Sequence, residues 1–314
     1  MDNAVNVQSL VEATGLKVFS GGKYLKTKQI YASDISRPGL ELTGYFDYYP
    51  AERIQVLGMT EISYARKMDQ DKRKEVMAKL CADAATPCFI ISRYLPVPAE
   101  LDVAAKSNGI PVLRSKLPTT RLLAKLTDFL ESQLAERKSL HGVLVDIYGL
   151  GVLITGDSGV GKSETALDLI KRGHRLIADD RVEVYQKDEQ TIRGEAPKIL
   201  RHLLEIRGIG IIDVMNLFGG AGAVRAETDI SLIVHLEDWG PDKQFDRLGS
   251  GEQKFKIFDV EVPQIAVPVK IGRNLAIIIE AAAMNFRAKT MGYDATKLFE
   301  NNLNNLIKEN SNEQ

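Results

Sequence analysis

The sequence predicts an α/β protein of two domains, of which the first has a mostly parallel sheet. The chain has 314 residues, which is too long for one small hydrophobic core. In its first part, short apolar runs alternate with charged, helix-like stretches, a pattern typical of parallel sheets. After residue 138 the sequence becomes rich in glycine and in strand-like runs. We therefore expect one domain over residues 1–138 and a second over residues 139–314.

The N-terminal elements are expected to alternate between strand and helix and to end in a linking helix. Strand-like runs lie at 54–58 (IQVLG), 87–92 (PCFIIS) and 110–113 (IPVL). Helix-like stretches lie at 62–80 and before Asn108. The segment 119–139 carries leucines and a phenylalanine on one helical face, with Thr119 or Thr120 as the candidate capping residue. Such a helix is suited to joining the two domains.

Composition excludes several classes of partner. The formal net charge is −1, whereas binding to nucleic acid or to an anionic membrane requires a basic surplus or stripe. Cys81 and Cys88 are the only cysteines and are typical of small buried residues in a reducing compartment. The N-terminus has no signal-peptide pattern, and the apolar run LAIIIEAAAM is interrupted by Glu280. We expect a cytoplasmic protein.

A phosphate-binding loop follows the first strands of the second domain. The segment LITGDSGVGKSET has Gly156, four further residues and then Gly161-Lys162-Ser163, between an apolar strand and a helix-like run. Backbone N–H groups in such a loop bind phosphate at a helix N-terminus. Lys162 is expected to reach the β- and γ-phosphates and Ser163 to bind Mg²⁺. The predicted nucleotide-binding residues are Gly156, Asp157, Ser158, Gly159, Val160, Gly161, Lys162 and Ser163.

The apolar strands before this loop suggest where a histidine lies. The segment HGVLVDIYGLGVLITG is typical of two strands joined by a tight turn, which we expect at Gly149 and Leu150. Tyr148 then pairs near Gly151, and counting outward places His141 opposite Ser158, beside the loop. His174, His202 and His235 have no comparable support and are interpreted as structural.

Phosphoryl transfer also needs carboxylates near the phosphates, and the sequence offers several. Asp179-Asp180 ends an apolar strand and is the first candidate for a base or metal site, and Glu205, in a glycine-punctuated segment, is the second. Other carboxylates at comparable positions are Asp213, Glu237 and Asp238. Arg225 and Arg247 lie in glycine-bearing stretches and are candidates for covering phosphoryl charge. Each of these residues could instead be a solvated surface group. The C-terminal tail is expected to form an amphipathic helix that packs on a core or a neighbouring subunit.

The ordered series of motifs resembles the bacterial HPr kinase/phosphorylase family. The motifs are the segment from His141 through HRLIADDRVEV, then LEIRGIGIIDV, QFDRLG and VPVKIGRN. The resemblance implies a P-loop kinase domain similar to the nucleotide-binding core of phosphoenolpyruvate carboxykinase. It also implies a bifunctional enzyme that phosphorylates a serine of the phosphocarrier protein HPr with ATP or pyrophosphate. The same enzyme would remove that phosphate by phosphorolysis, in which inorganic phosphate is the acceptor and pyrophosphate the product.

The resemblance also implies roles for individual residues. The family's catalytic residues fall on His141, Lys162, Asp180 and Arg247, and its metal-binding residues on Ser163 and Glu205, with Asp179 in a supporting position. The stretch associated with dephosphorylation falls on Val267, Pro268, Val269, Lys270, Ile271 and Gly272, where the family pattern has proline in place of Ile271. The implied metal is Mg²⁺, with Mn²⁺ as the alternative.

The implied biology is carbon catabolite repression by a hexamer that responds to fructose 1,6-bisphosphate. Two other functions remain open. One is a small-metabolite kinase or carboxykinase-like enzyme, because a P-loop with carboxylates serves any phosphoryl transfer. The other is a regulatory switch that binds ATP without transferring phosphate.

Overall fold

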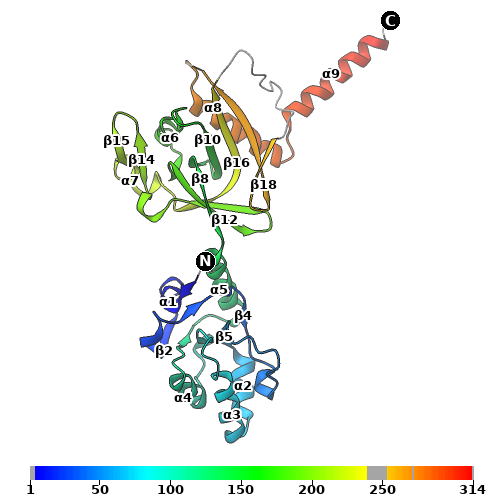
Figure 1. Cartoon of the computed structure of the whole chain (residues 1–314). Helices are drawn as coiled ribbons and strands as arrows, with labels where there is room; N and C mark the ends of the chain where they lie inside the picture. The colour runs from blue at the N-terminus through cyan, green and yellow to red at the C-terminus, as the bar shows by residue number, and fades with distance from the viewer. Residues whose placement is uncertain (1–3, 239–252, 271, 313–314) are drawn as a thin grey trace. The chain divides into compact units, whose positions relative to one another are not determined.

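The computed structural model describes residues 4–238, 253–270 and 272–312 (Figure 1). The chain divides into two compact units, one ending at Glu136 and the other beginning at Arg137. The boundary expected from the sequence lies two residues later, after residue 138. Each unit has its own sheet and its own buried apolar clusters.

The N-terminal unit is built on a five-stranded sheet in the order β2-β7-β6-β5-β4. The strands are β2 (Lys17–Ser20), β4 (Ile35–Ser36), β5 (Ile54–Leu57), β6 (Phe89–Ile91) and β7 (Val112–Arg114). Strands β4 to β7 are parallel and β2 is antiparallel to β7, which confirms the mostly parallel sheet. A separate two-stranded sheet pairs β1 (Val5–Asn6) with β3 (Gln29–Ile30).

The helices of this unit cover the parallel strands. They are α1 (Val7–Thr14), α2 (Met59–Lys67), α3 (Gln70–Leu80), α4 (Ala99–Ser107) and α5 (Thr119–Leu134). The stretch expected as one helix over 62–80 is two, because the Asp69 side chain accepts a hydrogen bond from the Asp71 N–H and starts α3. Cys81 and Cys88 are free and buried, as expected, and burial raises the pKa of each thiol to about 12.

The start of α5 differs from the expectation. Its N-cap is Pro118, and no side chain caps it. The Thr119 hydroxyl lies 2.9 Å from the Ser92 hydroxyl instead, so the prediction of Thr119 or Thr120 as the cap was wrong. The expected apolar face is present, with Leu122, Leu126 and Leu130 buried.

The C-terminal unit contains a nine-stranded sheet whose main path runs β11-β9-β10-β16-β13-β12-β8, with β18 beside β16 and β17 beside β18. The strands are β8 (Arg137–His141), β9 (Val143–Ile147), β10 (Leu150–Gly156), β11 (Arg175–Ala178), β12 (Arg181–Asp188), β13 (Thr191–Glu195), β16 (Glu227–Asp238), β17 (Gln253–Ile257) and β18 (Val260–Val269). Strands β10, β16 and β18 are parallel neighbours. Their carboxyl ends therefore meet at one edge of the sheet, where ligands bind in open α/β folds.

Helices and one hairpin complete this unit. They are α6 (Lys162–Lys171), α7 (Val214–Leu217), α8 (Leu275–Thr290), α9 (Ala295–Asn312) and the hairpin of β14 (Leu203–Ile206) with β15 (Gly210–Asp213). The largest apolar cluster joins β9, β10 and β16 to α6 and α8. The C-terminal tail forms the α9 helix as expected, but Leu298, Leu303 and Leu306 are about half exposed, so the expected packing on a core of this chain was wrong. Among the described residues, no helix has the length and apolar character needed to span a bilayer.

The β9–β10 hairpin has a different register from the one expected. Ile147 pairs with Leu150, so the turn is Tyr148-Gly149 and the predicted pairing was wrong by two residues. Both turn residues have positive φ, 54° and 88°, as a type I′ turn requires. The Asp146 carboxylate accepts a hydrogen bond from the Gly149 N–H at 2.7 Å and holds this turn.

His141 also reaches the loop by a route other than this hairpin. It ends β8, which pairs with β12 so that His141 faces Arg181. The chain turns into β9 at Gly142, where a Cβ atom would lie 2.6 Å from the Ile154 carbonyl oxygen. The predicted pairing of His141 with Ser158 across the β9–β10 hairpin was therefore wrong.

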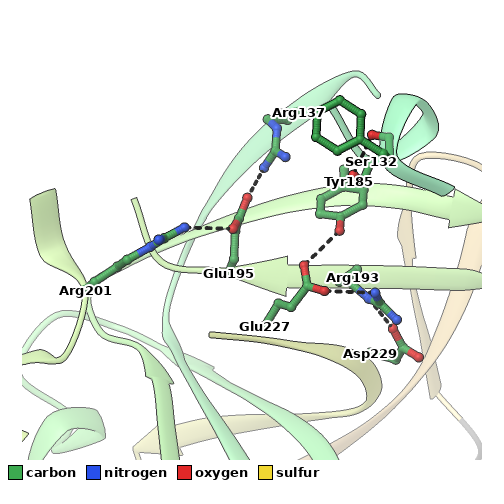
Figure 2. A network of polar contacts seen from close by, with 9 residues as sticks. Ser132, Arg137, Tyr185, Arg193, Glu195, Arg201, Glu227 and Asp229 are labelled. Carbon is green, nitrogen blue, oxygen red and sulfur yellow. Dashed lines mark hydrogen bonds and ion pairs between the residues drawn. The ribbon is translucent and has the colours of Figure 1, made fainter. Parts of the chain in front are cut away.

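A polar network joins β8, β12, β13 and β16 within this unit (Figure 2). Arg193 lies 2.7 Å from Asp229 and 3.0 Å from Glu227, and the Tyr185 hydroxyl donates to Glu227 at 3.0 Å. Burial raises the pKa of Tyr185 to about 12. Glu195 accepts from both Arg137 and Arg201. These cross-strand contacts fix the register of β8, which ends at His141, and of β12, which begins directly after Asp180.

We expect Gly151→Ala to destabilise the fold by about 3 kcal/mol, because overpacked sites in ordered cores cost amounts of this order. A Cβ at residue 151 would lie 2.1 Å from the Asp229 carbonyl oxygen and 2.7 Å from Thr228 Cγ2. Urea unfolding measures the loss. Gly222→Ala is the control, since its Cβ would meet nothing within 4 Å. Equal stability of the two variants would contradict this packing account.

Candidate active site

The phosphate-binding loop connects β10 to α6 in the conformation that its glycines permit. Gly156 has a φ of 144°, and a Cβ there would lie 2.5 Å from the Leu236 carbonyl oxygen, so only glycine fits. The Lys162 ammonium donates to the Gly156 and Asp157 carbonyl oxygens at 2.8 and 2.9 Å. The Ser163 hydroxyl donates to Asp179 Oδ1 at 2.9 Å. The loop thus presents the two side chains that the sequence assigns to phosphate and metal.

A pocket of about 180 Å³ opens beside this loop. It is lined by His141, Ser158, Gly159, Gly161, Lys162, Ser163, Glu164, Asp179, Asp180, Glu205 and Arg207. The structure therefore brings seven of the predicted side chains to one place: His141, Ser158, Lys162, Ser163, Asp179, Asp180 and Glu205. Gly156, Asp157 and Val160 belong to the loop without lining the pocket.

Asp179 connects the loop helix to the β14–β15 hairpin. Its side chain is buried, and its two oxygens accept hydrogen bonds from the Ser163 hydroxyl and, at 2.8 Å, from the Glu205 N–H. Burial raises the pKa of this carboxyl group, although both hydrogen bonds oppose the shift. Asp179 therefore sets the position of the two residues expected to bind metal.

Asp180 differs from its neighbour because its carboxylate is exposed to the pocket. Its side chain is 65% exposed, and its φ of 62° is left-handed, a conformation that aspartate tolerates better than most residues. His141 Nδ1 lies 3.0 Å from the Asp180 carbonyl oxygen and 3.1 Å from its Oδ1. The Asp180 carbonyl also accepts from the Gly142 N–H at 3.1 Å. The strand end thus aims an accessible carboxylate, with a histidine beside it, at the phosphate loop.

Lys162 is the buried cation of the pocket. Burial lowers the pKa of its ammonium group, and the nearby carboxylates Asp157, Asp179 and Asp180 oppose that shift. A desolvated cation is attracted more strongly by phosphate than one in water, because the local dielectric is lower. This environment suits a residue that stabilises charge on a transferring group.

Several candidate residues from the sequence lie elsewhere. Neither Arg225 nor Asp213 lines the pocket. Arg225 pairs with the buried Asp146, and Asp213 accepts from the Asn216 N–H at the start of α7. Val267 pairs with Leu236, which itself pairs with Gly156. The stretch from Val267 to Val269 therefore ends at the same sheet edge as the loop, outside the pocket lining. Arg247 and Ile271 lie outside the described residues, and Lys270 and Gly272 flank Ile271.

Sequence reasoning missed Arg207, which lines the pocket. Its Nη2 donates to the Ser158 hydroxyl at 3.0 Å, and its guanidinium lies across the loop at Gly159. The signal was available, since an arginine two residues after Glu205 opens a glycine-containing turn. Glu164, the second residue after Lys162, also lines the pocket.

The donor set fits Mg²⁺ and a polyphosphate. The Ser163 hydroxyl and the carboxylates of Asp179, Asp180 and Glu205 are hard oxygen donors that line one pocket with the loop. No preformed cage of three acidic, histidine or cysteine side chains occurs in the part of the chain that the structure describes. Mg²⁺ seldom needs such a cage, because it is usually held by one or two protein oxygens together with phosphates and water.

We expect the buried charge of Asp179 to make stability depend on pH. Its pKa is raised above the ordinary 3.8, so the native state retains this proton to higher pH than the unfolded chain does. Stability relative to Asp179→Asn is therefore greatest at low pH and falls as pH rises through the raised pKa. Urea unfolding of both proteins between about pH 4 and pH 7 measures the difference. A difference that does not change with pH would contradict the assignment.

Comparison with known proteins places the whole chain in one family. Residues 5–130 match the family described as HPr Serine kinase N terminus, and residues 132–303 match HPr Serine kinase C-terminal domain. The HPr kinase/phosphorylase of Lactiplantibacillus plantarum is 68% identical over 99% of this chain and 98% of its own. That of Latilactobacillus sakei subsp. sakei is 66% identical over the full length of both chains.

A solved structure is also similar to part of the chain. It is the Hpr(Ser) kinase/phosphatase from Coxiella burnetii, which is 38% identical and covers 52% of this chain and 98% of its own, with a TM-score of 0.46. The family matches to both halves and the full-length identity to the curated relatives decide the assignment. The chain belongs to the HPr kinase/phosphorylase family.

Proposed function

We propose that this protein is a bifunctional phosphotransferase that phosphorylates a serine of HPr and removes the phosphate by phosphorolysis. The observation that carries the proposal is the single pocket in which the loop, Asp180 and Glu205 meet, in a chain 68% identical to a curated HPr kinase/phosphorylase over nearly its whole length. The donor is ATP or pyrophosphate, bound with Mg²⁺ or Mn²⁺. Bound metal and polyphosphate supply an activated phosphoryl group whose charge is partly neutralised.

In the forward direction, Asp180 accepts the proton of the incoming serine hydroxyl. The serine oxygen forms a bond to the terminal phosphorus while the bond from that phosphorus to the bridging oxygen breaks. Lys162 leaves the loop carbonyls and binds the oxygens of the transferring group, on which charge develops. Ser163 and Glu205 would hold the metal, and Asp179 keeps both in place through its two hydrogen bonds.

In the reverse direction, Asp180 starts protonated and acts as the acid. An oxygen of inorganic phosphate bonds to the phosphorus of phosphoserine, the serine O–P bond breaks, and Asp180 returns the proton to the serine oxygen. The products are HPr and pyrophosphate. His141, with Nδ1 3.1 Å from the Asp180 carboxylate, orients that carboxylate and contacts the bound phosphate. Arg247 is proposed to cover the phosphoryl charge.

The remaining parts of the proposal concern assembly, regulation and the roles of the two domains. We infer a homo-oligomer, a hexamer, that works in the cytoplasm in carbon catabolite repression and responds to fructose 1,6-bisphosphate. The proposed domains are 1–138, with a role in regulation or assembly, and 139–314, with the catalytic site. The stretch from Val267 to Gly272, at the sheet edge next to the loop, is proposed to serve dephosphorylation.

Mass spectrometry of HPr after incubation with the protein and Mg-ATP tests the proposal. Phosphate on a single serine is the expected result. Intact ATP binding without phosphate on HPr would overturn it. Transfer to a small hydroxyl compound would then indicate a metabolite kinase, and transfer to no acceptor would indicate an ATP-binding switch.

A further inference from the structure

The β14–β15 hairpin has one face on the core and one face in solvent. Leu204 and Ile206 are buried in the cluster under the sheet. The opposite face carries Glu205 and, directly across from it, Ile211. Ile211 is 67% exposed and Ile209, in the connecting turn, is 72% exposed. Two large apolar side chains thus stand in solvent on an element whose other face is firmly packed.

These side chains lie at the rim of the phosphate pocket. Directly opposed residues of an antiparallel pair point to the same face with Cβ atoms about 5 Å apart, and Glu205 lines the pocket. Ile209 lies in the same turn as Arg207, which also lines it. Figure 1 shows β14, β15 and α7 together at one side of this unit. The hairpin is held at the pocket by the hydrogen bond from the Glu205 N–H to Asp179.

A protein that brings a serine into this pocket must contact its rim. Even a weak, transient interface buries on the order of 600 Å² on each partner, a patch about 14 Å in radius. Ile211, directly across from the pocket residue Glu205, and Ile209, two residues from the pocket residue Arg207, are placed to fall within such a patch. A small acceptor would not contact this surface. A protein that covers exposed apolar groups beside the pocket is bound more tightly, because removing these groups from water is favourable.

We propose that Ile209 and Ile211 form a docking surface for the protein substrate, and that they meet an apolar surface beside its acceptor serine. The inference rests on the proposed function and deepens it. The free energy released when a partner fully buries one isoleucine side chain corresponds to about a tenfold change in affinity. The surface should therefore determine the KM for HPr, while leaving the kcat and the binding of nucleotide to the loop unchanged.

The test compares Ile209→Ser/Ile211→Ser with the wild type in HPr phosphorylation. We expect the KM for HPr to rise at least about tenfold, with unchanged kcat and unchanged binding of a fluorescent ATP analogue. Ile209→Leu/Ile211→Leu keeps the apolar area and should restore the KM. Val103→Ser is the matched control, since Val103 is 65% exposed on α4 of the other unit.

Four outcomes overturn the inference. An unchanged KM for HPr in the serine variant overturns it alone, as does an equal rise in Val103→Ser. A change of oligomeric state by sedimentation would show that the two isoleucines face a second copy of the chain instead. Failure of the wild type to phosphorylate HPr would overturn the proposed function, and the inference with it.

Discussion

Asp180→Asn should reduce phosphate transfer to HPr and its phosphorolytic removal by about 10³-fold or more, because general acid–base groups contribute on this scale. Asparagine neither accepts nor returns the serine proton. It keeps the size of the side chain and leaves the loop contacts of Lys162 and Ser163 intact. Nucleotide binding should therefore be nearly unchanged. Rates with HPr in both directions and ATP-analogue titration measure these effects.

The matched control for Asp180 is Asp259→Asn. Asp259 is 87% exposed and does not line the pocket, so this variant should transfer phosphate at the wild-type rate. Near-normal transfer by Asp180→Asn would remove Asp180 from the mechanism. Loss in only one direction would contradict the use of one acid–base group for both.

Lys162→Met should lower kcat/KM by about 10²- to 10³-fold in both directions, the range found when one preorganised donor is removed from a developing charge. The methionine side chain is close to that of lysine in length but cannot donate a hydrogen bond to phosphate oxygens. Because burial already lowers the pKa of Lys162, removal of this cation should not weaken the fold greatly. Steady-state kinetics and urea unfolding measure the two effects.

Lys171→Met serves as the control for Lys162. Lys171 ends the same helix and is exposed, so its loss should leave kcat/KM unchanged. A Lys162→Met variant with wild-type kinetics would mean that the loop binds phosphate through its backbone alone.

Local patterns predicted much of the site. The spacing of Gly156, Gly161, Lys162 and Ser163 was sufficient to predict the phosphate-binding loop, because such a loop is built from consecutive residues. Asp179-Asp180 could be identified because the end of an apolar strand is a position where a carboxylate faces the sheet edge. The alternation of strands and helices also predicted the parallel N-terminal sheet, because each strand–helix–strand repeat is formed by neighbouring residues in the sequence.

The errors arose where the structure depends on turn geometry or on distant partners. The β9–β10 register was wrong by two residues because Tyr148 adopts a left-handed conformation that the sequence alone does not reveal. His141 reaches the pocket because β8 pairs with β12. This pairing brings His141 to Asp180, which lies 39 residues later in the chain. The glycine-containing turn after Glu205 marked the position of Arg207, but its contact with Ser158 depends on the folded hairpin, which brings its guanidinium to that hydroxyl.

The central claim is that one pocket transfers phosphate in both directions, with inorganic phosphate as the acceptor in reverse. The most direct test is to incubate serine-phosphorylated HPr with the protein, the metal ion and isotopically labelled inorganic phosphate, and to separate the products. The account predicts that label appears in pyrophosphate in proportion to the HPr dephosphorylated. Dephosphorylation of HPr at the same rate without inorganic phosphate, and with no labelled pyrophosphate, would contradict it.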